Sequence, residues 1–179
     1  MRYTHTQMEE QAVLATAANM CAAARTAPKG KGFDNIYTLV LTGAEKDALA
    51  AKMHEVADRE FGDKPIFFRR DAENLKAAQA VVLIGTKRVY AGLPFCSFCG
   101  FENCAACKEA GAWCAFPMLD LGIALGSAAA VATDSRVDNR IMFSAGKVAA
   151  EMGYMEGDMR FHAIPLSVSA KNVFFDRKS

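Results

Sequence analysis

Five of the six cysteines in this 179-residue chain lie close together in the sequence. They are Cys96, Cys99, Cys104, Cys107 and Cys114, whereas Cys21 lies far upstream. Thiols at this density either form disulfides or hold a soft metal, because thiolate is a preferred ligand of zinc and of iron–sulfur clusters. The segment of residues 92–117 is therefore the first candidate functional region.

The spacing of these cysteines is compatible with two nested sets of metal ligands. One set is Cys96-x2-Cys99-x4-Cys104, completed by Cys114. The other is Cys99-x4-Cys104-x2-Cys107, which has the spacing of plant-type ferredoxins and needs a distant fourth ligand. The two sets differ in whether Cys107 or Cys96 is the extra thiol, and the spacing alone leaves both open.

Zinc is the main rival metal for this segment. A structural zinc site usually joins two Cys-x2-Cys pairs that lie roughly 12 to 20 residues apart. Here only four residues separate Cys99 from Cys104, and no histidine lies in the segment. The spacing therefore favours an iron–sulfur cluster, with [4Fe–4S] ahead of [2Fe–2S], over zinc, disulfides or simple packing.

Composition and charge restrict where the protein acts. With 21 basic and 20 acidic side chains, the net charge is +1 and predicts neither a nucleic-acid partner nor a membrane partner. The apolar segment from Ala12 to Ala24 resembles a signal peptide, but Glu9 and Glu10 precede it where a signal peptide carries positive charge. We therefore interpret it as a helix and predict a cytoplasmic protein, in which reduced thiols favour metal binding over disulfides.

The remaining chain must fold into the elements that position these cysteines. Its length fits a single domain over residues 1–179. Apolar periodicity and capping signals predict helices over residues 7–26, 42–60, 71–78, 118–133 and 139–152. Branched and apolar runs predict strands over residues 36–41, 80–85 and 161–168. In detail, we expect a capping box from Thr42 to Glu45, a helix N-cap at Asp71, and an edge or bulge position for Pro165.

A basic, glycine-rich loop, Pro28-Lys-Gly-Lys-Gly-Phe-Asp-Asn35, follows the first predicted helix. Its two lysines, Lys29 and Lys31, could present ammonium groups and backbone amides to a phosphate. The alternative is a solvated turn. The loop lacks the glycine and lysine spacing of a Walker motif.

Two long runs of residues resemble the uncharacterised prokaryotic ferredoxin-domain family. They are Gly92-Leu-Pro-Phe-Cys-Ser-Phe-Cys-Gly-Phe-Glu-Asn-Cys104 and Cys114-Ala-Phe-Pro-Met-Leu-Asp-Leu-Gly-Ile-Ala-Leu-Gly-Ser127, joined by similar stretches over 137–142 and 164–177. This resemblance implies a cluster held by Cys96, Cys99, Cys104 and Cys114. Cys107 is then the extra thiol and the alternative ligand.

A second resemblance concerns the architecture. The run from Ala23 to Asn35 with the strand and helix that follow, and the stretch from Met152 to Leu166, resemble the flavin-dependent nitroreductase fold. This implies an α/β sandwich with a mixed sheet flanked by helices, an inserted cysteine-rich iron–sulfur loop, and a homodimer formed through long helices. It also implies FMN as a candidate second cofactor. The usual N-terminal arginine motif for the FMN phosphate is absent. The candidate cofactor-binding residues are therefore Arg25, Lys29, Lys31, Asn35, Lys171 and Arg177.

These inferences lead to one functional hypothesis and one alternative. We expect an iron–sulfur redox protein that transfers electrons to a partner protein or a small-molecule acceptor, and that acts as a flavin-linked reductase if FMN binds. The alternative is a non-catalytic binding or sensor protein with a structural zinc or iron–sulfur site. No catalytic side chain can be identified from spacing.

Overall fold

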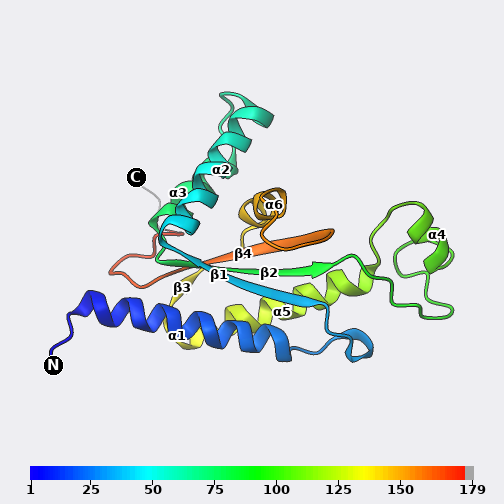
Figure 1. Cartoon of the computed structure of the whole chain (residues 1–179), viewed down its shortest axis with the longest axis horizontal. Coiled ribbons are helices and arrows are strands. Elements are labelled where there is room, and N and C mark those ends of the chain that lie inside the picture. Colours follow the sequence, from blue (N-terminus) through cyan, green and yellow to red (C-terminus); the bar gives the residue numbers. More distant parts are fainter. Residues whose placement is uncertain (176–179) are drawn as a thin grey trace.

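The computed structural model describes residues 1–175 and contains a sheet covered by helices on both faces (Figure 1). The strands are β1 (Ile36–Thr42), β2 (Ala80–Lys87), β3 (Asp138–Asn139) and β4 (Met159–Ser167). The helices are α1 (His5–Thr26), η1 (Gly30–Gly32), α2 (Gly43–Phe61), α3 (Phe67–Ala77), α4 (Cys104–Glu109), α5 (Ala115–Asp134) and α6 (Phe143–Glu151). The predicted α/β sandwich is confirmed.

The strand order is β1-β2-β4-β3, and every pairing within residues 1–175 is antiparallel, whereas a mixed sheet was expected. Strand β2 lies at the centre and is buried along almost its whole length. Its continuous apolar run suits this place, because a central strand covered on both faces has no polar side. Val81 and Leu83 belong to the core under α2, α3 and α6, whereas Val82 and Ile84 belong to the core under α1 and α5.

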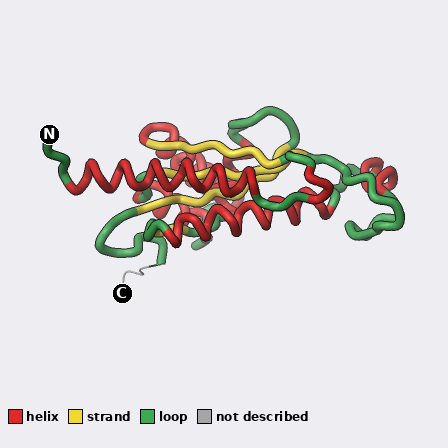
Figure 2. Tube along the Cα trace, turned by 90° about the horizontal axis from the view of Figure 1, so that it is seen from below, coloured by secondary structure: helices red, strands yellow, loops and turns green. Residues whose placement is uncertain are grey.

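The helices α1 and α5 pack side by side on one face of the sheet (Figure 2). Helix α5 is, in the described part of the chain, the one helix long and apolar enough by length and composition to cross a membrane. Its Leu121, Ala124 and Ala128 are buried against α1 and the sheet, which is the packing of a core helix.

The sheet register defines the end at which the functional region lies. Ile36 pairs with Thr86 at one end of β2, and Leu166 pairs with Ala80 at the other. The basic loop enters the sheet at the Thr86 end, and the cysteine-rich segment leaves from the same end. Figure 1 shows that segment projecting beyond the sheet, with α4 near its tip, before α5 returns underneath.

Several local predictions require correction. Thr42 is the N-cap of α2, but its side chain makes no capping hydrogen bond, so the predicted capping box is wrong. Helix α3 begins at Phe67 rather than Asp71, because Phe68, Ala72 and Leu75 form its buried stripe. Asp71 lies inside that helix, where its buried carboxylate accepts a hydrogen bond from Ser144 Oγ at 2.6 Å.

The predicted last helix is shorter, because Asp138 and Asn139 pair with β4 as strand β3. Strand β4 is internal, so the edge position expected for Pro165 is wrong. The Ala163 backbone exchanges hydrogen bonds with Met142 across a single bridge on the β3 side. Backbone groups alternate between the two sides of a strand, so the Pro165 nitrogen points to the same side as the Ala163 nitrogen. There it lies between the Met142 bridge and the residues paired with β3, where no hydrogen-bond donor is required.

Candidate metal centre

The cysteine-rich segment has little regular structure. Residues 88–103 form no helix or strand, and two of their non-glycine residues, Phe95 and Ser97, have positive φ angles of 53° and 44°. Gly100 has a φ of 83°, and its N–H donates to the Ser97 carbonyl at 2.9 Å. These left-handed residues turn the chain tightly around the thiols, which a helix or strand could not do.

Four thiols line one narrow cavity inside this loop. They are Cys96 and Cys99 from the loop, Cys104 at the start of α4, and Cys114, the N-cap of α5. Phe98, Phe101 and Phe116 supply apolar walls. Cys107 is fully buried and does not line this cavity.

The protein environment distinguishes two of the thiols. The pKa of Cys99 is lowered, mainly because the backbone of Phe101 hydrogen-bonds to its sulfur. Burial raises the pKa of Cys107 to about 11, with a further contribution from its hydrogen bond to Cys99. Cys99 therefore has the more acidic thiol of this pair, and Cys107 has the less acidic one.

The donors around this cavity are all thiols, which is the ligand type of iron–sulfur clusters and of four-cysteine zinc sites. In the chain up to residue 175, no group of three or more His, Cys, Asp or Glu side chains converges closely enough for one metal ion. The cavity among the four thiols measures about 10 Å³, which is room for roughly one water. The all-thiol donors fit a cluster in number and chemistry, and its entry would require the irregular loop to move outward.

The end of the cysteine-rich segment is held against the sheet. Arg88 donates to the Gly111 carbonyl at 2.7 Å, and the Tyr90 hydroxyl donates to the Ala112 carbonyl at 3.0 Å. The guanidinium groups of Arg88 and Arg160 lie 5.6 and 5.0 Å from the Trp113 ring centroid. These contacts fix the backbone immediately before Cys114.

A second cavity of about 300 Å³ adjoins the cysteine cavity. Loop residues 30–35, residues 89–91 and the start of α5 line it, and Ala91 and Phe116 line both cavities. The Gly30 N–H donates to Asp120 Oδ1 at 2.9 Å, which joins the loop to α5. Sequence reasoning missed Asp120, although a single acid within the apolar run of residues 115–133 could have marked it as a buried hydrogen-bond acceptor.

The structure separates the predicted cofactor-binding residues into two groups. Lys31 and Asn35 line the second cavity. Arg25 instead pairs with Asp34 at 2.5 Å and donates to the Ile36 carbonyl at 2.7 Å. Lys29 donates to backbone carbonyls at the end of α1, including that of Ala27 at 2.8 Å. Arg25 and Lys29 therefore hold the loop rather than face the cavity.

Of the two predicted residues of the C-terminal tail, Lys171 does not join this group within one chain. Lys171 follows β4 at the Ala80 end of the sheet, whereas the basic loop enters at the Thr86 end, roughly 20 Å away by strand rise. Arg177 lies outside the described residues. Sequence reasoning could not separate these cations, because their distances depend on strand register.

Solved structures with the same arrangement of elements are flavoproteins and nitroreductases. A BluB-like flavoprotein from Clostridium difficile matches with a TM-score of 0.58 and 19% identity, covering 100% of this chain and 87% of that one. A nitroreductase with bound FMN from Bacteroides fragilis matches with a TM-score of 0.59 and 13% identity, covering 92% and 82%. The chain therefore has the nitroreductase fold, as its sequence predicted.

Sequence relatives identify the family. Residues 110–177 match the model of uncharacterised proteins containing a ferredoxin domain (DUF2148). An uncharacterised protein from Archaeoglobus fulgidus is 43% identical over 166 residues, which is 88% of each chain. The chain belongs to this ferredoxin-domain family, and family and fold together indicate a role in redox chemistry or electron transfer.

Proposed function

We propose that the protein is an electron-transfer protein that carries one [4Fe–4S] cluster on Cys96, Cys99, Cys104 and Cys114. The observation that carries this proposal is that these four thiols, contributed by a loop and two helices, line one cavity. Membership of a ferredoxin-domain family supports it. The matched part of the family model includes Cys114 but not the other three cysteines.

The cluster, when bound, supplies one-electron chemistry, and the chain supplies its surroundings. The backbone of Phe101 and the thiol of Cys107 lower the pKa of Cys99, and the same donors beside a ligand sulfur would help to set the reduction potential. The Phe98 and Phe116 rings, 6.0 Å apart between centroids, shield part of the cavity from water. Cys107 therefore acts as a neighbour of the cluster and not as a ligand.

The flavin-linked version of this function requires FMN, and the described residues of one chain do not fit its phosphate. Arg25 and Lys29 bind the protein's own carboxylate and carbonyls. Lys31 lines the cavity but donates to the Ala91 carbonyl at 3.2 Å, and Asp34 and Asp120 line the cavity as well. We therefore propose the cluster protein and assign no step to FMN.

We also propose a homodimer in the cytoplasm, where a reducing environment keeps the thiols available. Leu119 and Ile123 on α5, and Leu14 on α1, each expose about half of their side chains. Apolar side chains along two adjacent helices are suited to cover those of a second chain. Electrons would pass to a redox protein or a small-molecule acceptor, with no nucleic-acid or membrane partner.

Anaerobic purification followed by iron, acid-labile sulfide, zinc and flavin analysis tests the proposal. We expect about four irons and four sulfides per chain and a broad absorption band typical of thiolate-ligated clusters. Serine at position 96, 99, 104 or 114 should abolish the cluster. Cys107→Ser and Cys21→Ser should retain it.

Two outcomes would contradict this assignment. Loss of the cluster in Cys107→Ser but not in Cys96→Ser would support the second ligand set, provided that circular dichroism shows both variants folded. One zinc per chain without sulfide would support the alternative of a non-catalytic protein with a structural metal.

A further inference from the structure

We propose that the 300 Å³ cavity beside the cysteine loop binds a planar aromatic molecule that is uncharged or cationic and lacks phosphate. The binding site itself is independent of the cluster. The inference that its ligand exchanges electrons rests on the proposed function. The proposed ligand lacks the phosphate of FMN, which is bound in a solved structure of the same fold.

Aromatic walls indicate a planar ligand. Phe33, Tyr90 and Phe116 line the cavity from three separate parts of the chain. Phe33 exposes 57% of its surface, so its ring can cover a bound molecule without leaving a packed core. A volume of about 300 Å³ lies at the lower limit of small-ligand pockets. The cavity thus suits a ring system better than a long chain.

The charges around the cavity disfavour an anion. Asp34 and Asp120 line it, and Lys31 is the single cation among its lining residues. The Asp120 side chain is nearly buried, and no Lys or Arg of the first 175 residues forms an ion pair with it. Arg25 is already paired with Asp34. A phosphate placed here would meet an uncompensated carboxylate in a partly desolvated site.

The same polar groups can recognise a heteroaromatic ring. Asp120 uses Oδ1 to accept from the Gly30 N–H, which leaves Oδ2 able to accept a ring N–H. The Asn35 side chain carries both an acceptor and a donor for ring carbonyl and N–H groups. Two such contacts can orient one ring edge within the aromatic walls.

The position of the cavity couples it to the proposed cluster. Phe116 and Ala91 form a wall shared with the cavity that the four thiols line. A ring in contact with Phe116 would therefore lie one side chain away from the sulfur ligands.

Riboflavin and FMN are matched probes, because they share one ring system and differ by the phosphate. Titration of each into the purified protein, followed by flavin fluorescence, should give a dissociation constant at least about tenfold lower for riboflavin, since the Asp120 carboxylate repels the phosphate. Equal or tighter binding of FMN would overturn the proposal. So would binding of neither probe.

Two variants test the residues involved. Asp120→Asn keeps an acceptor for the Gly30 N–H but removes the charge, so it should reduce the preference for riboflavin about threefold or more. Asp134→Asn, at the exposed far end of α5, is the matched control and should change nothing. Phe33→Ala should weaken both probes about tenfold. An unchanged preference in Asp120→Asn would contradict the charge argument.

Iron and sulfide analysis of the same samples separates the two proposals. Selective riboflavin binding by protein without sulfide would support the cavity while contradicting the cluster. A loaded cluster in protein that binds neither probe would support the cluster while contradicting the proposed ligand of the cavity.

Discussion

The Arg160 guanidinium lies 5.0 Å from the centroid of the Trp113 ring, and Trp113 directly precedes the candidate ligand Cys114. Arg160 is the second residue of strand β4, so this contact joins the sheet to the end of the cysteine-rich segment. Arg88 approaches the same ring at 5.6 Å and forms an ion pair with Asp158. The backbone at Cys114 is therefore held by the sheet as well as by α5.

Removing the Arg160 contact should loosen this end of the cysteine-rich segment. Arg160→Gln should lower the free energy of unfolding by about 0.5–1 kcal/mol, the value of an exposed cation–π contact. It should also speed the loss of iron from the loaded protein. Trp113 is the one tryptophan of the chain, so its fluorescence in urea titrations reports the contact directly. Arg2→Gln, at the exposed N-terminus, is the control, and equal stability of both variants would contradict the role of Arg160.

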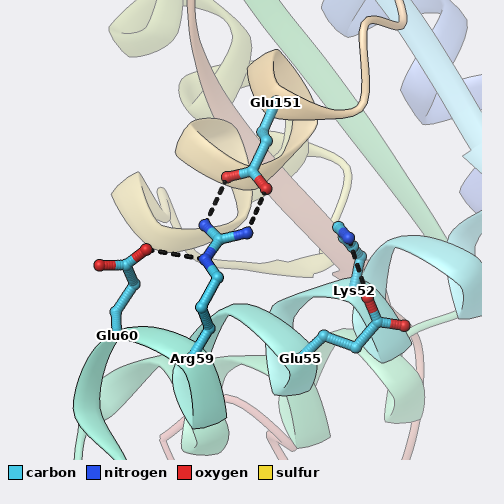
Figure 3. A network of polar contacts seen from close by, with 5 residues as sticks. All are labelled: Lys52, Glu55, Arg59, Glu60 and Glu151. Carbon is cyan, nitrogen blue, oxygen red and sulfur yellow. Dashed lines mark hydrogen bonds and ion pairs between the residues drawn. The ribbon is translucent and has the colours of Figure 1, made fainter.

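An ion-paired network between α2 and α6 should make stability depend on pH and salt (Figure 3). Arg59 donates to both Glu151 carboxylate oxygens, at 2.7 and 3.0 Å, and this contact lowers the pKa of Glu151. A lowered pKa in the folded state adds stability above the ordinary value of 4.5, and this stability is lost as pH falls through the folded value.

Glu151→Gln should therefore destabilise the protein at pH 7, but by less than about 1 kcal/mol because both side chains are partly exposed. The difference from the unmodified protein should shrink in high salt and disappear in acid. Urea titrations at several pH values measure it. Glu55→Gln removes the exposed pair with Lys52 within α2 and should have a smaller effect. A difference that persists at pH 3 would point to packing instead of charge.

His162 should contribute a second pH dependence, closer to neutrality. Burial lowers the pKa of this imidazole, and its Nδ1 is buried without a hydrogen-bond partner in the described chain. Two cations, Lys147 and Arg160, and two carboxylates, Glu151 and Asp158, line the same cavity. Below the ordinary histidine pKa of 6.5, the unfolded chain binds a proton that the folded imidazole resists. The free energy of unfolding should therefore decrease as the pH is lowered below 6.5.

His162→Gln should remove that slope between pH 6.5 and the lowered folded pKa. Thermal unfolding across this range is the measurement. His5→Gln, at the exposed start of α1, should leave the slope unchanged. An identical slope in His162→Gln and the unmodified protein would assign the proton uptake to another group.

The close crossing of α6 over β4 should tolerate no side chain at Gly146. A Cβ there would lie 2.1 Å from the Phe161 carbonyl oxygen and 2.6 Å from the His162 Cα, both of which are backbone atoms. We expect Gly146→Ala to cost about 3 kcal/mol or more in urea titrations, because the helix must move off the sheet.

Gly122→Ala on α5 is the matched control, since no atom lies within 4 Å of its added Cβ. This change should stabilise the protein by about 0.4–1 kcal/mol. If Gly122→Ala destabilised the protein instead, a partner chain would have to cover that face. A Gly146→Ala variant of unchanged stability would show that the crossing of α6 over β4 relaxes at little cost.

Much of the fold could be predicted from local patterns. The continuous apolar run of β2 indicated a central strand, and the periodicity of residues 7–26 indicated a helix that extends to Thr26. The density of cysteines marked the candidate site, because so many thiols at close spacing have few structural uses. These features depend on neighbours in sequence, and local geometry is sufficient to express them.

Other features were decided by contacts between distant segments. Asp71 fits the sequence pattern of a helix N-cap, but the burial of Phe68, Ala72 and Leu75 starts α3 at Phe67 and so places Asp71 inside the helix. Arg25, Lys29 and Lys31 are similar cations in the sequence, yet Arg25 and Lys29 hold the loop, whereas Lys31 lines a cavity and donates to the Ala91 carbonyl in its wall. That cavity exists because Gly30 meets Asp120 across 90 positions of the chain. The sequence by itself determined which groups could do chemistry, and the tertiary structure decided which of them face one another, because those distances depend on sheet register and helix packing.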